Sequence, residues 1–228
     1  MRSTGDGKRL RILAVADLHG KPERLAALEH LTEKRRPDVV VVAGDAAPRR
    51  RLMTTFTGLS RLGPPVYVVR GNSEGRGFDR LVKGFTALIP LTTTPLSCGG
   101  VHLAGLGGTL PLPLASRIGW WEGRRLNALR PLPAPGVLVV HPPPYGVLDE
   151  VLGGWHAGSR GLARWIVRHP PALVLCGHIH ERPGVATIGA TTVINCAVGH
   201  RSSGALIDMG GGNLAVEMLP PVISSASV

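Results

Sequence analysis

The sequence predicts an α/β protein with two mixed β-sheets, and two observations carry this prediction. In the first part of the chain, short runs of valine, isoleucine and leucine alternate with segments of helical periodicity, a pattern typical of parallel β-α-β units. In the last part, strand-like runs follow one another with only glycine-rich turns between them, as in an antiparallel meander. At 228 residues the chain can bury one sizeable core, so we expect a single domain over residues 1–228.

Six apolar runs bounded by glycine and proline are expected to be strands that are buried on both faces. They are residues 10–16, 38–43, 66–69, 101–105, 137–140 and 172–176. Between the early strands, residues 22–35 begin with Pro22 and repeat leucine at helical spacing, and residues 50–61 have the same periodicity. Both segments are therefore predicted to be helices. A third helix is expected over residues 160–168.

Four further strands are expected near the carboxyl terminus, where they form the predicted meander. They are residues 185–188, 191–195, 205–209 and 214–219. Before residue 137, residues 106–135 are rich in proline and contain Trp120 and Trp121. A long irregular segment of this kind often covers a site, and its tryptophans either stack on a substrate or anchor the segment.

Composition limits the environment and the partners of the protein. The formal net charge of +11 attracts anions such as phosphate esters, and nucleic acid is a less favoured partner because no basic stripe stands out. The three cysteines are odd in number, and Cys176 and Cys196 lie in apolar runs, so buried thiols are expected rather than disulfides. The amino terminus lacks the apolar region of a signal peptide, and no run could span a bilayer. We therefore expect a cytoplasmic protein without membrane contact.

Metal-ligand residue types follow five of the predicted strands at the point where each strand ends. They are Asp17 and His19, Asp45, Asn72, His141, and the pair His178 and His180. Taken singly, each has an ordinary alternative, such as a helix N-cap for Asp17 and a turn residue for Asn72. Because the carboxyl ends of strands in an open α/β sheet point into one crevice, we expect these donors to meet there. Oxygen and imidazole donors without a thiolate suit Mn²⁺, Zn²⁺, Fe or Ni²⁺, and seven donors suit two ions that share a carboxylate.

The order of these motifs resembles that of the calcineurin-like metallophosphoesterase superfamily. The motifs are D-x-H at Asp17, G-D at Asp45, G-N at Asn72, the single His141, and G-H-x-H at His178. The stretches HPPPYGVLDEVLGGWHAGSRGL and GLGGTLPLP are similar to a small prokaryotic, largely archaeal subgroup of predicted phosphoesterases related to cyclic-nucleotide phosphodiesterases. The resemblance implies a four-layer α/β-β/α sandwich with a two-metal site between the sheet ends.

The resemblance also implies which residues hold two divalent ions. Asp17, His19 and His180 hold the first ion, Asn72, His141 and His178 hold the second, and Asp45 bridges both. The implied activity is hydrolysis of phosphoester bonds by a hydroxide that bridges the two ions and attacks phosphorus in line. Asp45 and Asn72 would then act in catalysis, because the NH₂ group of Asn72 stays free to donate to a substrate oxygen.

One position departs from the pattern of the family. Many members carry histidine after this asparagine, where the imidazole is the usual candidate for protonating the leaving oxygen, whereas this chain has Ser73 followed by the matching acid Glu74. A serine hydroxyl can bind a phosphoryl oxygen but is a poor general acid. His156, with Tyr145 as the second choice, is therefore our candidate for the proton donor, and its alternative is a structural role in a glycine-rich loop. The missing imidazole favours phosphodiesters over monoesters.

The remaining substrate contacts are open from sequence alone. Arg70 and Arg76 flank the Asn72 loop and could hold phosphate, as could Ser73. Ser159 either contacts substrate or is the N-cap of the helix over residues 160–168. The leading hypothesis is a phosphoesterase that acts on a small phosphoester, and a nuclease of the same superfamily or a non-catalytic metal-binding scaffold are the alternatives. The oligomeric state, including homo-oligomers, is left open.

Overall fold

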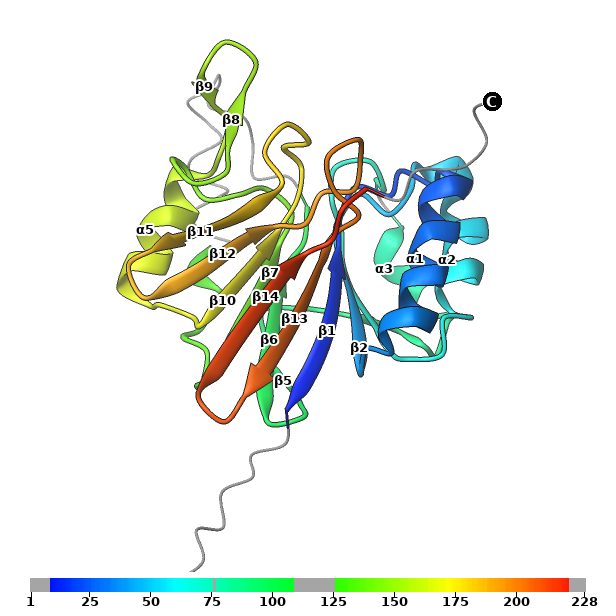
Figure 1. The fold of residues 1–228 in the computed structure, drawn as a ribbon, viewed down its shortest axis with the longest axis horizontal. Helices are drawn as coiled ribbons and strands as arrows, with labels where there is room; N and C mark the ends of the chain where they lie inside the picture. Colours follow the sequence, from blue (N-terminus) through cyan, green and yellow to red (C-terminus); the bar gives the residue numbers. More distant parts are fainter. Residues whose placement is uncertain (1–8, 76, 109–125, 222–228) are drawn as a thin grey trace, which may run out of the picture.

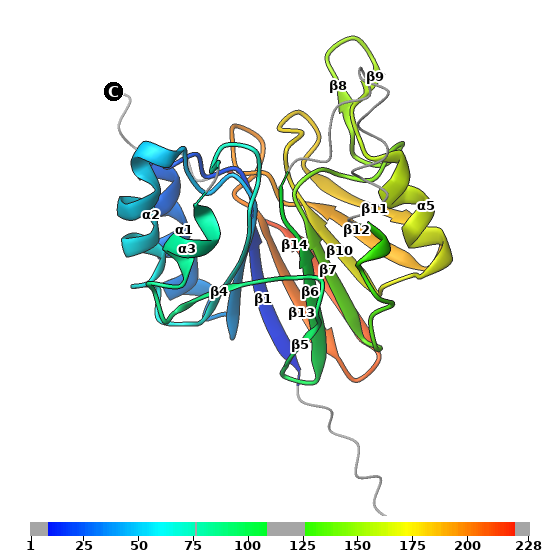
Figure 2. The same ribbon diagram turned by 180° about the vertical axis from the view of Figure 1, so that it is seen from behind.

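Two six-stranded sheets lie face to face, and helices cover their outer faces (Figures 1 and 2). The computed structural model describes residues 9–75, 77–108 and 126–221. Helices α1 to α3 lie outside one sheet and α5 lies outside the other. This arrangement confirms the predicted α/β-β/α sandwich of two mixed sheets.

The first sheet combines the early strands with the last two of the chain. From edge to edge it contains β14 (Asn213–Met218), β13 (Ala205–Gly210), β1 (Leu10–Val15), β2 (Val39–Ala43), β3 (Val66–Val69) and β4 (Leu88–Pro90). Strands β1 to β4 are parallel, and β13 and β14 add antiparallel pairs. The helices on its outer face are α1 (Pro22–Arg35), α2 (Leu52–Leu59), which the 3₁₀ turn η1 (Arg49–Arg51) precedes, and α3 (Phe78–Val82).

The second sheet is built from the middle of the chain. From edge to edge it contains β11 (Gly184–Ile188), β12 (Thr191–Asn195), β10 (Leu173–Cys176), β7 (Gly136–Val140), β6 (Val101–Leu106) and β5 (Leu96–Cys98). The four inner strands are parallel and the two edge strands are antiparallel to their neighbours. Helix α5 (Arg160–Arg168) covers its outer face, and a hairpin of β8 (Glu150–Val151) and β9 (Trp155–His156) stands above it.

Three layers of apolar side chains hold the four layers of backbone together. Alternate residues of β1 show why, because Ile12 and Ala14 face the other sheet while Leu13 and Val15 face α1 and α2. The outer face of the second sheet packs against the buried side of α5, including Ile166. Among the described helices, none is long and apolar enough to cross a membrane.

The prediction of a carboxyl-terminal meander is wrong. The four strands form two separate hairpins, and each hairpin belongs to a different sheet: β11 and β12 join β10, whereas β13 and β14 join β1. Strands that are neighbours in sequence usually pair with each other. Here β10, which contains Cys176, and β1, which contains Leu13, each have an edge whose backbone N–H and C=O groups need a partner, and one hairpin pairs with each edge. Short elements such as α3, β4 and β5 were not predicted, because three to five residues carry too little periodicity.

The cysteines and the tryptophans complete the comparison of the expected fold with the observed one. Cys176 and Cys196 are buried free thiols, as predicted. Trp120 and Trp121 lie outside the described residues, so their role stays a prediction.

We expect Ser159→Ala to lower the free energy of unfolding by about 1 kcal/mol. Ser159 is the N-cap of α5, and its Oγ accepts a hydrogen bond of 2.8 Å from the Leu162 N–H. Ser159→Asp keeps an oxygen acceptor at the same place and serves as the control in urea unfolding. Equal stability of the alanine and aspartate variants would contradict the assigned cap.

Candidate metal centre

The seven predicted donors lie together where five parallel strands end. Asp17 and His19 follow β1, Asp45 follows β2, Asn72 follows β3, His141 follows β7, and His178 and His180 follow β10. The loops after β1 and β2 are joined by backbone hydrogen bonds, of 3.0 Å from Asp17 N to Gly44 O and 2.9 Å from His19 N to Asp45 O. Between the sheets, Asp17 Oδ2 accepts a 2.8 Å hydrogen bond from His178 N–H, so the two sheets contribute donors to the same place.

One group of donors surrounds Asp17. Asp17 Oδ1 is 3.2 Å from His180 Nε2 and 3.8 Å from His19 Nε2. The two ring nitrogens of His19 and His180 are 3.4 Å apart. Their ligand atoms all lie within 4.8 Å of one another, which is close enough for one ion to be bound by all three.

A second group surrounds His141. Its Nε2 is 3.0 Å from Asn72 Oδ1 and 3.5 Å from Asp45 Oδ1, and its ring centroid is 5.0 Å from that of His178. Asp45 also faces the first group, because its Oδ2 is 3.9 Å from His19 Nε2. Asp45 thus has one oxygen toward each group, as a bridging ligand requires.

The arrangement of the donors suits binding of cations better than hydrogen bonding among the donors themselves. Asp17 Oδ1 is buried and has no hydrogen-bond partner among the described residues. Buried carboxylate oxygens are normally paired, so this atom needs a cation or a proton. The facing ring nitrogens of His19 and His180 also need a cation or a proton between them, since a neutral imidazole presents a lone pair on one nitrogen. Divalent ions satisfy both requirements.

The backbone at four donors is in the left-handed region, which only glycine adopts freely. The φ angles are 62° at Asp17, 51° at His19, 52° at Asp45 and 71° at His178. Such conformations cost about 1 to 3 kcal/mol each and collect at functional sites. The fold therefore accepts local strain in order to aim these side chains.

Hydrogen bonds from the backbone orient the side chains that would bind the ions. His141 Nδ1 lies 3.0 Å from Ala43 O, so Nδ1–H donates there and Nε2 is left as the donor atom for an ion. Asp45 Oδ1 accepts bonds of 2.7 Å and 2.9 Å from the N–H groups of Asn72 and Ser73. Asp17 Oδ2 accepts one of 2.8 Å from His178 N–H. These contacts cross between strands, and no pattern along the sequence indicates them.

Two glycines of the motifs are needed because other ligands pack against them. A Cβ on Gly71 would lie 2.1 Å from Asp45 Oδ1, and one on Gly177 would lie 2.6 Å from Asp17 Oδ2. Any side chain there would displace a candidate ligand. The glycine of G-N and that of G-H-x-H are thus part of the site.

The electrostatics of Asp45 and His141 are coupled. Burial alone would raise the pKa of Asp45, but the interaction with His141 and the bond from Ser73 N–H outweigh it and hold that pKa low. Burial opposes protonation of His141, and Asp45 and Asp17 outweigh it, so its pKa is raised. Because an ion needs the neutral ring, protons and cations compete for this pair.

Glu74 anchors the turn that carries Asn72. Its side chain is fully buried, and Oε2 accepts a 2.8 Å hydrogen bond from Gly71 N–H. Burial, and then the nearby charge of Asp45, raise the pKa of Glu74 to about 7. Ser73 Oγ beside it is buried and has no hydrogen-bond partner among the described residues.

The predicted arginines are less informative. Arg70 lines a small cavity of about 110 Å³ together with Phe78 and Asp79, and within the described ranges no side-chain hydrogen bond joins it to the seven donors. Arg76 lies outside the described residues. A role for Arg70 in binding substrate stays a prediction.

His156 forms a pair with a carboxylate that sequence reasoning missed. Its Nδ1 is 2.7 Å from Oδ1 of Asp149, which is buried, and Asp149 Oδ2 accepts a 3.0 Å bond from Gly158 N–H. The Tyr145 ring lies 5.2 Å from the imidazole, and Arg160 donates to the Tyr145 hydroxyl at 3.1 Å. The Gly153-Gly154 turn between Asp149 and His156 was the available signal, because such turns close hairpins.

Both ends of the hairpin segment are tied to segments that carry donors. Asn195 Nδ2 donates to Ile179 O at 2.8 Å and to Leu148 O at 3.5 Å, and Ile179 lies between His178 and His180. Ser159 N donates to Pro143 O at 2.9 Å, two residues after His141. The hairpin therefore rises beside the metal end of the second sheet (Figure 1). Among the described residues, no hydrogen bond or ring contact joins His156 to the seven donors.

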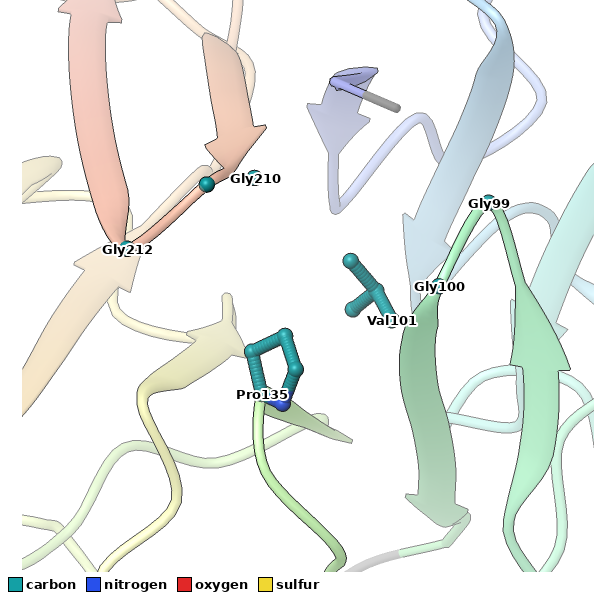
Figure 3. Close-up of a pocket in the computed structure, with 7 residues that line it drawn as sticks. Gly99, Gly100, Val101, Pro135, Gly210 and Gly212 are labelled. Carbon is teal, nitrogen blue, oxygen red and sulfur yellow. The ribbon is translucent and has the colours of Figure 1, made fainter. Parts of the chain in front are cut away.

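A cavity of about 320 Å³ lies at the opposite end of the sheets (Figure 3). It is lined by the turns at Gly99 and Gly100 and at Gly210 to Gly212, and by Val101 and Pro135. These residues lie at or just before the start of β6 and β7, or at or just after the end of β13, so they are far along the strands from the donors. Its lining, as far as the structure describes it, contains no titratable side chain, and the cavity does not belong to the candidate metal centre.

Comparison with known proteins identifies relatives of the whole arrangement. A family profile described as calcineurin-like phosphoesterase matches residues 10–182, which include all seven donors. UPF0046 protein K07C11.7 of Caenorhabditis elegans is 44% identical over 61 residues, which are 27% of this chain and only 21% of that protein. Uncharacterized protein MJ1162 of Methanocaldococcus jannaschii is 25% identical over 200 residues, 82% of this chain and 88% of that protein. The crystal structure of TT1561 from Thermus thermophilus has a similar fold, with a TM-score of 0.67 at 20% identity over 92% of this chain and 98% of the other.

Proposed function

Because this chain belongs to the calcineurin-like phosphoesterase family, we propose that it hydrolyses phosphodiesters in preference to monoesters, with two divalent ions held by the seven donors. The observation that carries the proposal is the position of Asp45, which has one oxygen toward each of the two donor groups. Asp17, His19 and His180 would hold one ion, and Asn72, His141 and His178 the other. Bound there, the ions would supply Lewis acidity and an activated water at neutral pH.

The residues of the chain then bind and orient the phosphoryl group. Asn72 Oδ1 faces His141, which leaves its NH₂ group to donate to a phosphoryl oxygen. The hydroxyl of Ser73 is buried and has no partner among the described residues, so it could do the same only after its side chain rotates toward the substrate. Neither group can protonate the leaving oxygen at neutral pH.

His156 is the group that we assign to this proton transfer. When the ring carries both protons, Nδ1–H is held by Asp149 and Nε2–H can be given to the leaving oxygen. As the phosphorus–oxygen bond breaks, its electron pair goes to that oxygen together with the Nε2 proton. The ring returns to the neutral tautomer that Asp149 already binds. This role requires a leaving group that reaches from the donors to the hairpin.

A substrate panel tests the proposed function. Protein loaded with Mn²⁺, Zn²⁺ or Ni²⁺ is assayed with bis-p-nitrophenyl phosphate, p-nitrophenyl phosphate and cyclic nucleotides, and bound metal is counted by mass spectrometry. We expect two ions per chain and a higher kcat/KM for the diesters. Two bound ions without hydrolysis of any substrate would favour the alternative of a metal-binding scaffold, and faster monoester hydrolysis would contradict the preference for diesters.

A further inference from the structure

Two arginines are fixed to the loop that carries the first pair of donors. Arg24 of α1 donates to Asp17 O, and Arg51 of η1 donates to Gly20 O at 3.2 Å. The loop from Asp17 to Gly20 thus has a guanidinium at each end. Each guanidinium has five N–H groups, and one such bond leaves the others available to an anion.

Arg24 lies beside the candidate metal centre. Its guanidinium donates to the backbone oxygen of Asp17, and the side chain of the same residue is one of the seven donors. Arg24 is therefore close enough to the donors to contact an anion that extends from them.

Two more arginines lie next to Arg51. Arg49 and Arg50 lie in η1 beside Arg51, and all three are exposed. Within the described part of the chain, none of these four arginines forms an ion pair with a carboxylate, whereas Arg11, Arg35 and Arg182 each do. We call Arg24, Arg49, Arg50 and Arg51 the arginine rim.

We propose that the arginine rim binds a second phosphate group of the substrate while the seven donors hold the phosphoryl group that is cleaved. The preferred substrates are then phosphodiesters that carry at least one further phosphate, as in a phosphorylated nucleotide ester or a short single-stranded oligonucleotide. The inference rests on the proposed function for the position of the cleaved group.

The chemistry of the rim fits phosphate better than a single carboxylate or a neutral group. Arginine binds phosphate oxygens through paired N–H groups, and it stays charged at every physiological pH. Arg24 and Arg51 are already held by the backbone, so they lose less side-chain entropy on binding than free arginines do. Arg49 and Arg50 are exposed neighbours of Arg51 in the same turn, so their charge adds to that of Arg51 at the surface.

A matched pair of substrates isolates the second phosphate. Thymidine 5′-p-nitrophenyl phosphate and its 3′-phosphorylated form have the same leaving group and differ by one phosphate. In the wild type we expect a higher kcat/KM for the 3′-phosphorylated ester. In Arg49→Gln/Arg50→Gln we expect the ratio of the two kcat/KM values to fall about tenfold. The control Arg61→Gln/Lys83→Gln removes the same charge from exposed residues after the ends of α2 and α3 and should keep the wild-type ratio.

A binding measurement without activity separates the rim from the proposed hydrolysis. Fluorescein-labelled oligothymidylate is titrated with metal-free protein at several salt concentrations. Loss of two phosphate contacts should reduce the slope of log K against log salt by about 1.4 in the rim variant and not in the control. Equal ratios and equal slopes in both double variants would overturn the inference. Salt-dependent binding that only the rim variant loses, without hydrolysis of either ester, would support the rim and reject the proposed function.

Discussion

The substitution Asp45→Asn is expected to lower kcat/KM by at least about a hundredfold and to reduce the number of bound ions. Asp45 has one oxygen toward each group, with Oδ1 3.5 Å from His141 Nε2 and Oδ2 3.9 Å from His19 Nε2. An amide has one acceptor oxygen and no charge, so it cannot serve both sides. Its oxygen would stay on the N–H groups of Asn72 and Ser73, and its NH₂ would face His19. Hydrolysis assays and metal counting by mass spectrometry measure both effects.

Asp38→Asn is the matched control for this experiment. Asp38 stands just before the same strand at its other end, where its carboxylate accepts a hydrogen bond from Arg11 N–H at 2.7 Å. It undergoes the same chemical change at a distance from the donors, so activity and metal content should stay at wild-type levels. The assignment of Asp45 as the bridging ligand is wrong if Asp45→Asn protein retains two ions and full activity.

The strands that end in donors could be predicted because the residues that identify each strand lie within the strand itself. Runs such as residues 39–43 are apolar throughout, as strands buried on both faces must be. Parallel strands place their carboxyl ends at one edge, so Asp17, Asp45 and Asn72 had to come together once these strands were identified. The same reasoning located His141 and the residues after β10.

Features that depend on contacts between strands were not predictable. The role of Gly71 follows from the 2.1 Å approach of its absent Cβ to Asp45 Oδ1, and nothing within the Asn72 loop indicates that approach. The division of the last four strands between two sheets is a similar case, because β12 and β13 are near in sequence yet join different sheets. Pattern analysis predicts an element and its buried face, whereas the neighbour of an edge strand is decided by the whole fold.

Asp149, the buried partner of His156, is another residue whose role could not be predicted from sequence patterns. Asp149 is adjacent to Glu150, which is partly exposed and pairs with Arg182, and the sequence does not distinguish the two acids. Only the hairpin turn brings Asp149 to His156. His156 could therefore be named from the sequence, whereas Asp149, which holds it, could not.

We expect His156→Gln to lower kcat about a hundredfold for diesters with poor leaving groups and to leave bis-p-nitrophenyl phosphate hydrolysis much less affected. The reason is that nitrophenolate departs without a proton, whereas an alkoxide does not. Asp149→Asn should give the same selectivity with a smaller loss, because Asp149 would act on the proton transfer through Nδ1–H of His156 and not on the substrate itself. The measurement is kcat across a series of aryl and alkyl phosphodiesters, plotted against the pKa of the leaving group.

Two controls keep this last prediction from being confused with a loss of structure. His102→Gln changes the same residue type at the start of β6, at the end of the second sheet away from the donors, and should leave the series unchanged. His156→Gly should recover part of its activity on poor leaving groups when imidazole is added, which a damaged fold would not do. A uniform loss across the series in both His156→Gln and Asp149→Asn would contradict proton donation, because a group that only helps binding or folding has no reason to distinguish leaving groups by their basicity.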